Sequence, residues 1–385
     1  MILKRRFIFL AISSILACGS PVQGSEAHHS WQIALEEIEG SMQHEYARKF
    51  AQTLNEKSNG RITCSIRFYG ELGTSDDITE LLQAGDIEFA FQSPGHLGSE
   101  IPEVQVFSIH YLFPTEFELL EKILRHGPRT YNTLQKYYNR HDLELISIIE
   151  EGWQIWTANK PLRSPADFEG LTFRVMSSPF LITAYRLYGA YVITVPYSEI
   201  YDNLALGRID AQSQPFFALQ EMKFYEVQDY MIKANQLPFI ATFVANHDFM
   251  TQLPNDTQTL IKESIETANE FIFDLEPKLN RQRKQMIMEA KPSMTYIELT
   301  DQEIAAFKEK AEPLRDKYLE MGGEGAPEVL DAVLADIQWA RQEKLRLLPA
   351  YWGPAAPRRP ITQKSGRSSR GWQVMDETHQ KDREN

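Results

Sequence analysis

The clearest periodic pattern in this sequence is a strict alternation of hydrophobic and polar positions in residues 61–68. Ile62, Cys64, Ile66 and Phe68 fall on one face of this segment. A period of two residues predicts a β-strand with one buried face. Cys64 therefore points inward, and we expect an inert core thiol rather than a nucleophile.

Helical patterns flank this strand on both sides. Residues 41–58 repeat large apolar side chains every four positions, start at Ser41 as a candidate N-cap and end at Asn59-Gly60. A second helix is expected to end near Gly85, followed by a strand over Ile87–Gln92. The order strand, helix, strand, helix, strand predicts a partly parallel sheet with right-handed crossovers.

The same rhythm returns later in the chain. The predicted strands there are 143–149, 172–175, 191–195 and 209–212, and the predicted helices are 179–187 and 198–206. Two α/β units in one chain favour an α/β fold with two lobes. In open α/β sheets ligands lie beyond the carboxyl ends of the strands, so we expect a cleft between the lobes.

The C-terminal third is predicted to be mainly helical. Residues 254–290 form a helical stretch of about 55 Å at about 1.5 Å per residue, enough to span both lobes. We expect Pro277 to kink or divide it. Thr300-Asp301-Gln302-Glu303 is a capping box that starts another helix, and a further helix is expected over 327–347.

The N-terminus has the features of a secretory signal peptide, predicted at residues 1–24. A basic start precedes an apolar run of about 11 residues, which is too short to span a bilayer. An alternative is a degenerate lipobox ending at Cys18, which would place a lipid anchor there. No other stretch approaches the length of a membrane span. Residues 348–385 are rich in proline and basic residues, and we expect a disordered tail.

Composition narrows the function. A formal net charge of -13 argues against nucleic acid as a partner. The sequence contains no HExxH, EF-hand, GxSxG, P-loop or GxGxxG motif and no metal-ligand spacing of histidines. We therefore expect no enzyme activity, no cofactor and no metal. Glu36, Glu37 and Glu39 crowd the end of the first strand; they form either an acid/base pair or, as we favour, a solvated or ligand-facing edge. These observations favour a secreted binding protein.

The segment 170–215 resembles the DctP-like solute-binding proteins of tripartite ATP-independent periplasmic (TRAP) transporters. The matching runs are Pro196-Tyr197-Ser198-Glu199-Ile200-Tyr201 and Gly207-Arg208-Ile209-Asp210-Ala211-Gln212, the second with Ala211 in place of the usual glycine. Gly70-Glu71-Leu72-Gly73 and the run 85–90 are similar to the family's first domain. The likeness covers about residues 30–345. It implies a type II-like, two-lobed periplasmic binding protein fold, with lobe I at 25–151 and 240–278 and lobe II at 152–239 and 279–347.

The resemblance implies that Arg174 clamps the carboxylate of the ligand. A planar guanidinium offers a charged, bidentate fork to a carboxylate. Gln154 stands where the family often has a second arginine, which puts a second anionic contact in doubt. Gln214 stands where the family has an asparagine that hydrogen-bonds the carboxylate.

Other expected ligand contacts are mostly aromatic. Tyr197 matches an aromatic lining position, and Phe216 or Phe217 is expected beside it. Trp153 and Trp156 are expected to share one face and form a flat apolar wall, with core packing as the alternative for each. Ser93 and His96 replace the charged contacts of sialic-acid-binding members. The full set of predicted ligand-binding residues is Arg174, Gln154, Trp153, Gln214, Tyr197, Phe216, Glu37 and Ser93.

The implied function is capture of a small organic acid in the periplasm. We expect an apolar or aromatic monocarboxylate, with a sugar acid as the alternative. The lobes would close over the ligand by a hinge motion, and the monomeric protein would deliver it to a separate TRAP membrane permease. Two other functions stay open: a ligand-sensing module that reports to a membrane receptor, and a secreted enzyme acting on a carboxylate.

Overall fold

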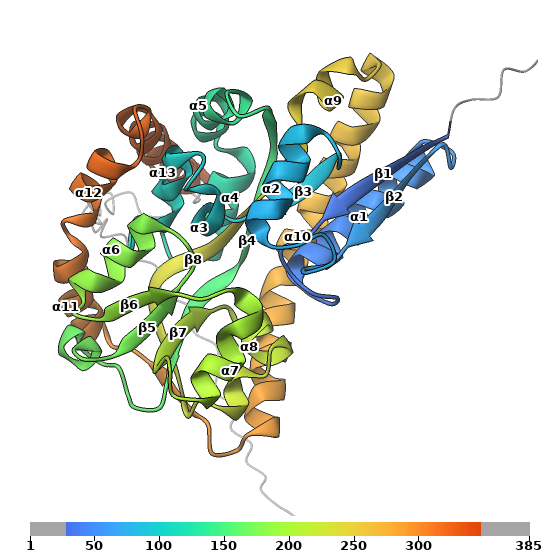
Figure 1. Ribbon diagram of the computed structural model, residues 1–385. Coiled ribbons are helices and arrows are strands. Elements are labelled where there is room, and N and C mark those ends of the chain that lie inside the picture. The colour runs from blue at the N-terminus through green and yellow to red at the C-terminus, as the bar shows by residue number, and fades with distance from the viewer. Residues whose placement is uncertain (1–27, 348–385) are drawn as a thin grey trace, which may run out of the picture. The chain divides into compact units, whose positions relative to one another are not determined.

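The computed structural model describes residues 28–347, and within them nine strands form one sheet (Figure 1). The strands are β1 (His29–Ala34), β2 (Ile62–Arg67), β3 (Phe89–Gln92), β4 (Leu143–Ala158), β5 (Thr172–Val175), β6 (Tyr191–Thr194), β7 (Ala211–Gln214), β8 (Tyr230–Asn246) and β9 (Thr295–Glu298). Their order is β2-β1-β3-β8-β4-β7-β5-β6, with β9 beside β8.

Helices cover this sheet. The longer ones are α1 (Met42–Lys57), α2 (Ser75–Ala84), α4 (Phe117–His126), α5 (Pro128–Asn139), α6 (Pro179–Leu187), α10 (Asn255–Ala290), α11 (Asp301–Ala311), α12 (Leu314–Met321) and α13 (Ala326–Leu347). The shorter ones are α3 (Pro94–Leu97), α7 (Ile200–Ala205), α8 (Phe216–Glu221) and α9 (His247–Gln252), with 3₁₀ turns η1 (Pro102–Ser108), η2 (Pro165–Phe168), η3 (Tyr197–Glu199) and η4 (Phe224–Glu226).

Two long antiparallel strands, β4 and β8, hold the sheet together. The last part of β8 pairs with β3, and through it with β1 and β2, while its other edge pairs with the first part of β4. The last part of β4 pairs with β7, and the first part of β8 pairs with β9. The pairs β1–β2, β1–β3, β5–β6 and β5–β7 are parallel, as the sequence predicted. The short parallel strands thus form two sets, β1 with β2 and β3, and β5 with β6 and β7, and the long pair β4–β8 connects the two sets.

The register between β4 and β8 is irregular at the middle of both strands. Glu150 pairs with Ile240 and Gly152 pairs with Phe239, which leaves Glu151 unpaired in a β-bulge. Gly152 has φ +126, and a Cβ there would lie 2.7 Å from Nδ2 of Asn280. Only glycine fits this backbone comfortably. The predicted lobe boundaries at 151/152 and 239/240 fall at this bulge, and the division into lobes stays a prediction.

Helix α10 is one unbroken helix of 36 residues with Pro277 inside it. We expected Pro277 to kink or divide the helix; it does not divide it, and the kink stays a prediction. Proline removes one hydrogen bond from the helical ladder, but α10 packs against α1, α8 and β4, and this packing holds the helix together. The helix contacts elements attached to both sets of short strands.

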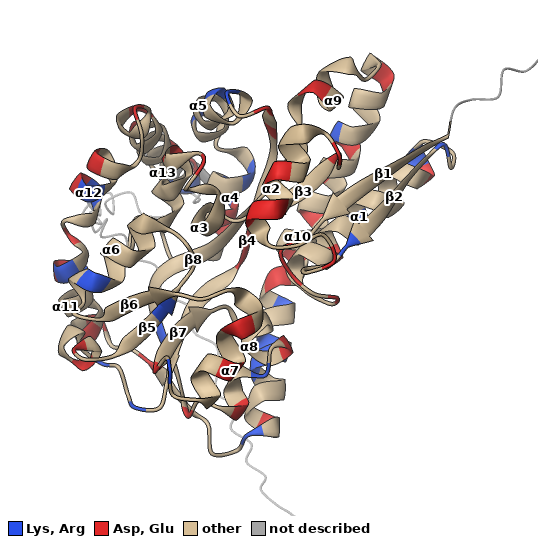
Figure 2. Cartoon of the chain, in the orientation of Figure 1, with Lys and Arg blue, Asp and Glu red and all other residues tan. Residues whose placement is uncertain are grey.

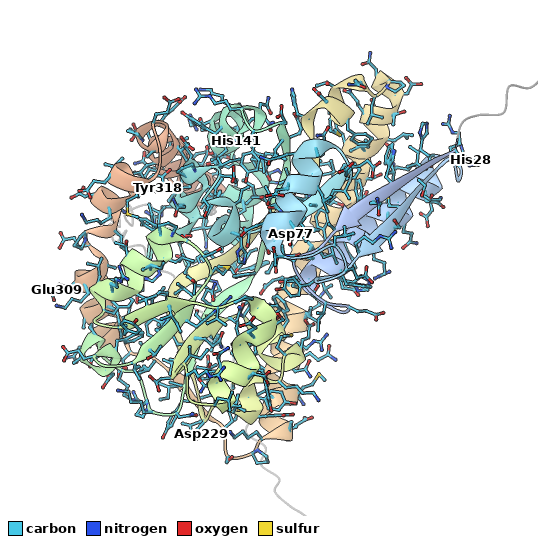
Figure 3. All side chains as sticks on the ribbon, viewed as in Figure 1. His28, Asp77, His141, Asp229, Glu309 and Tyr318 are labelled. Carbon is cyan, nitrogen blue, oxygen red and sulfur yellow. The ribbon has the colours of Figure 1, made fainter. Side chains whose placement is uncertain are left out.

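The local sequence patterns are largely confirmed. Ser41 caps α1 by accepting a hydrogen bond from the backbone N–H of His44, and Thr300 forms the expected capping box of α11. Thr74 and Asp77 form another capping box at α2, near the middle of the view in Figure 3. Cys64 is partly buried against the core, and burial raises the pKa of its thiol to about 12, which agrees with an inert thiol.

Strand β8 was not predicted from the sequence, and the strand predicted at 143–149 proves to be only the first half of β4. The patterns of both strands are interrupted at the same place in the sheet. β8 contains Pro238 and Asn235, the latter with φ 51, and β4 contains Gly152. Such residues normally argue against a central strand.

The predicted signal peptide, the possible lipid anchor at Cys18 and the basic tail at 348–385 lie outside the described residues. Within the described part of the chain, no helix is both long enough and apolar enough to cross a membrane.

The bulge at Gly152 generates a test of stability. Gly152→Ala should lower the free energy of unfolding by about 3 kcal/mol, because it combines backbone strain with displacement of Asn280. Gly170→Ala is the matched control: its φ is +77 but no atom lies within 4 Å of the added Cβ, so a loss of about 1 kcal/mol is expected. Urea denaturation measures both values, and equal losses would contradict the close contact with Asn280.

Candidate functional site

A cavity lies where the carboxyl ends of the short parallel strands meet. Its empty volume is about 930 Å³, including the part open to solvent, which suits a small molecule. Most residues that line it lie at or just after the carboxyl ends of β1, β2, β3, β5, β6 and β7, and Gln43 of α1 and Phe239 of β8 complete it. The lining residues are Glu36, Glu37, Gln43, Tyr69, Thr74, Ser75, Asp76, Ser93, His96, Arg174, Met176, Ser177, Thr194, Val195, Pro196, Tyr197, Gln214 and Phe239.

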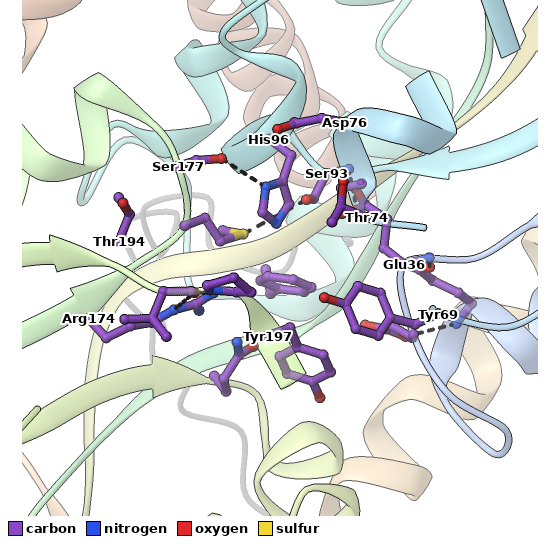
Figure 4. Close-up of a pocket in the computed structure, with 18 residues that line it drawn as sticks. Glu36, Tyr69, Thr74, Asp76, Ser93, His96, Arg174, Ser177, Thr194 and Tyr197 are labelled. Carbon is purple, nitrogen blue, oxygen red and sulfur yellow. Dashed lines mark hydrogen bonds between the residues drawn. The ribbon is translucent and has the colours of Figure 1, made fainter. Parts of the chain in front are cut away.

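Arg174 on β5 supplies the cationic wall of the cavity (Figure 4). Its side chain is buried, and Nε and Nη2 both donate hydrogen bonds to the carbonyl of Val195, at 2.9 and 2.7 Å. Burial lowers the pKa of Arg174 to about 10, so the guanidinium stays charged at neutral pH. Within the described residues Nη1 makes no hydrogen bond and no carboxylate lies within ion-pair distance. The outer edge of the guanidinium is free to bind an anion.

Glu36 lies on the opposite side of the cavity from Arg174 (Figure 4). Oε2 accepts a hydrogen bond of 2.7 Å from the backbone N–H of Ser93, while the buried Oε1 has no partner among the described residues. Burial raises the pKa of Glu36 to about 8, against the lowering effect of the Ser93 hydrogen bonds. An unpartnered carboxyl oxygen beside a cavity is a contact point for a ligand.

Glu37 adds a second carboxyl group to the same wall. It is buried, and its pKa lies well above the ordinary value, first because of burial and then because Glu151 lies nearby. Figure 2 shows basic colour on β5, which carries Arg174, and acidic colour on α2, which begins beside the cavity. No group of three or more acidic, histidine or cysteine side chains in the described chain has the arrangement of a metal site.

Aromatic rings cover the space between these charges. Tyr69 and Tyr197 meet edge to face with ring centroids 5.8 Å apart, and Phe239 lines the floor. Tyr69 follows β2 and Tyr197 follows β6, so the two rings join segments from the two sets of short strands. They give the cavity an apolar surface for the body of a ligand.

Polar contacts also join the two sides of the cavity. His96 Nδ1 lies 3.2 Å from Oγ of Ser177, and the hydroxyl of Ser99 donates to the carbonyl of Ser177 at 3.4 Å. The pKa of His96 is lowered to about 4, chiefly by burial and then by Arg174, so its imidazole is neutral. These contacts link α3 to the loop that follows β5.

Five of the eight predicted ligand-binding residues line the cavity: Arg174, Gln214, Tyr197, Glu37 and Ser93. Gln214 is buried, and its side-chain amide has no hydrogen bond among the described residues, which leaves it available to a ligand. Segments far apart in the sequence thus meet in one place, as their positions at strand ends predicted.

The other three predicted residues lie outside this cavity. Gln154 is buried and accepts a hydrogen bond of 2.7 Å from Oγ of Ser213, so its amide is engaged within the sheet. Trp153 packs half-buried against the core. Phe216 turns toward α10 and β9, where Lys284 Nζ lies 5.6 Å from its ring centroid.

For two further aromatic residues the structure favours the core-packing alternative over the cavity. Trp156 does not form an apolar wall with Trp153: it is fully buried, packs edge-on against Phe168 and donates a hydrogen bond to Tyr185. Phe217 is likewise a core residue. In both cases core packing, the alternative for a large aromatic side chain, accounts for the residue.

Sequence patterns missed much of the acidic and polar wall. Tyr69, Thr74, Ser75 and Asp76 follow β2 and open α2, a position that the strand-end rule could have identified. Gln43 lies on α1 and had no local signal, because only the tertiary fold turns it toward the cavity.

Comparison with known proteins decides the family. The model of the bacterial extracellular solute-binding proteins, family 7 (DctP), matches residues 34–321. The chain belongs to the DctP family of TRAP solute-binding proteins. As expected, this is a family of binding proteins and not of enzymes.

Two curated DctP relatives are similar over most of their length. The ectoine-binding periplasmic protein TeaA of Halomonas elongata is 33% identical over 82% of this chain and 92% of its own. The ectoine/5-hydroxyectoine-binding periplasmic protein UehA of Ruegeria pomeroyi is 33% identical over 86% of this chain and 97% of its own.

Solved structures confirm the mixed α/β fold of DctP proteins. The TeaA structure from Halomonas elongata superposes with a TM-score of 0.78 at 34% identity, covering 80% of this chain and 99% of that one. A TRAP solute-binding protein from Marinobacter aquaeolei VT8, solved as an apo open structure, gives 0.75 at 38% identity, covering 79% and 99%.

The burial of Glu36 predicts a stability that depends on pH. Its pKa is about 8 in the folded protein and near 4.5 when unfolded, so the folded state holds the proton more tightly. Between these values stability falls as pH rises. Glu36→Gln should remove this loss and raise the melting temperature relative to wild type, more at pH 8 than at pH 5. Glu39→Gln, at an exposed site nearby, is the control; an identical pH profile for Glu36→Gln and wild type would contradict the assignment.

Proposed function

We propose that this DctP protein captures a small zwitterionic solute in the periplasm, with ectoine as the first candidate, and delivers it to a TRAP permease. One observation carries the proposal: within one cavity the Arg174 guanidinium lies opposite Glu36, and the carboxyl group of Glu37 lines the same cavity. Ectoine, a cyclic zwitterion, carries both charges that these walls complement.

Arg174 is suited to the solute carboxylate, which was the expected part of the ligand. The Val195 carbonyl fixes the guanidinium plane through two hydrogen bonds, and the remaining donors face the cavity. Gln214 adds a neutral amide to this wall. A charge-assisted, bidentate contact held in this way orients the solute as well as binding it.

The acidic wall discriminates against a second carboxylate. Two unit charges 4 Å apart interact by about 4 kcal/mol at an effective dielectric constant of 20. A dicarboxylate reaching from Arg174 toward Glu36 and Glu37 would meet this repulsion wherever one of these carboxyl groups is ionised, whereas a cationic nitrogen would stabilise their ionised forms. The two glutamates thus support a zwitterion over the monocarboxylate expected from the sequence.

The cavity also supports capture by closure. Tyr69–Tyr197 and His96–Ser177 join the two sets of short strands across the cavity, while the β4–β8 bulge at Gly152 offers a place where the long strands can bend. The relative from Marinobacter aquaeolei VT8 is described as an open apo structure. Closure would exclude water and strengthen the buried charge contacts.

A sugar acid is the second candidate. The raised pKa of Glu36 favours a protonated carboxyl group at neutral pH, and a protonated carboxyl can donate a hydrogen bond to a hydroxyl group. Such a solute would use the same Arg174 contact but would present no cation to the acidic wall.

A thermal-shift screen distinguishes these candidates. Ectoine should raise the melting temperature, because a ligand that binds only the folded state stabilises it by mass action. A C4 dicarboxylate should give no shift. A shift with the dicarboxylate or a sugar acid but none with ectoine would contradict the zwitterion proposal.

Replacement of the guanidinium tests the proposed carboxylate contact. Arg174→Ala should weaken ectoine binding by about 2 kcal/mol or more, roughly 30-fold, because the carboxylate loses a charge-assisted partner. Arg208→Ala, at an exposed position in the same part of the chain, should bind like wild type. Isothermal titration calorimetry measures both, and unchanged affinity in Arg174→Ala would remove this residue from the site.

A further inference from the structure

A carboxyl group that does not line the cavity lies directly behind its acidic wall. Glu151, in the β4 bulge, is fully buried. Oε1 accepts a hydrogen bond of 3.1 Å from Nε2 of Gln43, and Oε2 has no partner among the described residues. A buried carboxylate oxygen without a donor carries a large desolvation cost.

The nearest group that can satisfy this oxygen is the carboxyl of Glu37. The two carboxyl groups lie within hydrogen-bond reach of each other. Gln43 holds both: its backbone N–H points to Oε2 of Glu37 at 3.4 Å and its side chain to Glu151. Two ionised carboxylates have no hydrogen to place between them, but a carboxyl and a carboxylate do.

We propose that Glu37 and Glu151 share one proton while the cavity is empty, and that the cationic group of a captured solute displaces this proton to solvent. The inference rests on the proposed function, because it requires the solute cation to lie against Glu37. Glu151 is then a positioning residue: it acts on the solute through Glu37.

The proton balance is simple. In the empty cavity the pair is one carboxyl and one carboxylate, with a net charge of −1. When the solute cation contacts Glu37, the shared proton leaves and both groups become carboxylates. No covalent bond in the solute forms or breaks, and one proton is released for each solute bound.

The surroundings oppose a second negative charge until a cation arrives. The charged and titratable groups around the pair are Glu36 after β1, Glu150 on β4, Glu221 on α8, Glu276 and Arg283 on α10, Tyr69 and Tyr197 at the cavity, and Arg174 on β5. Arg283 is a nearby cation, and its Nη2 lies 3.3 Å from Glu221, which it partly neutralises. Burial raises the pKa of both members of the pair, that of Glu151 to about 7.

The release of a proton on binding fixes the direction of the pH dependence. The empty protein binds more protons than the complex, so affinity should rise with pH through the neutral range and fall on acidification. If Glu151 had a purely structural role, its replacement would change the free energy of unfolding but would leave the pH dependence of solute affinity unchanged.

The first experiment uses the empty protein and needs no ligand. Carbon-13 NMR of glutamate carboxyl groups, titrated through the neutral pH range, should show a transition that is lost in both Glu151→Gln and Glu37→Gln. Glu150→Gln is the matched control, because Glu150 is an equally buried neighbour on β4 that does not line the cavity; it should keep the transition. Other buried glutamates, Glu36 among them, also titrate near this range, so the proposal is overturned if every transition of the wild type survives in Glu151→Gln.

The second experiment is calorimetry with ectoine in buffers of different ionisation enthalpy. Wild type at neutral pH should release more protons than Glu151→Gln, by close to one proton, and Glu150→Gln should match wild type. Ectoine binding with equal proton release in wild type and Glu151→Gln would overturn the inference. Absence of any ectoine binding would instead refute the proposed solute, and the titration of the empty protein would still decide whether the pair holds a proton.

Discussion

The backbone carbonyl of Val195 accepts two hydrogen bonds from the buried guanidinium of Arg174. This guanidinium lines a cavity opposite Glu36, and Glu37 lines the same cavity. Buried charges without partners are costly. Burial accordingly raises the pKa of Glu36 and Glu37 and lowers the pKa of Arg174, because it disfavours the charged form of each group. A solute that carries both opposite charges relieves this cost on both sides at once, and that is the basis of the selectivity proposed above.

The architecture explains how such a site can exist. Parallel strands bring their carboxyl ends together, and β4 and β8 hold two sets of these ends around one space. The same long strands are interrupted at Gly152, beside Asn280 of α10 and next to Glu151. The bulge that breaks the strand register therefore also positions the carboxyl group behind the acidic wall.

The sequence predicted the parts of this arrangement that depend on local rules. The helix caps at Ser41 and Thr300 and the short strand that carries Arg174 follow from residue type and spacing. It missed β8, because Pro238 and Asn235 interrupt its pattern, and it left open whether Trp156 and Phe217 pack in the core, where both are buried. The acidic wall was only half recognised. Glu36 and Glu37 lie at a strand end, and their partner Gln43 lies at the start of the next helix, but Glu151 comes from a distant strand and no local pattern reports that contact.

The central claim concerns where the two charges of a solute lie, and a crystal structure of the protein with ectoine would test it most directly. The account predicts the solute carboxylate on the free edge of the Arg174 guanidinium, its cationic nitrogens toward Glu37 and Glu36, and its ring against Tyr69 and Tyr197. A solute found with its carboxylate away from Arg174, or bound elsewhere while the cavity holds only water, would contradict it.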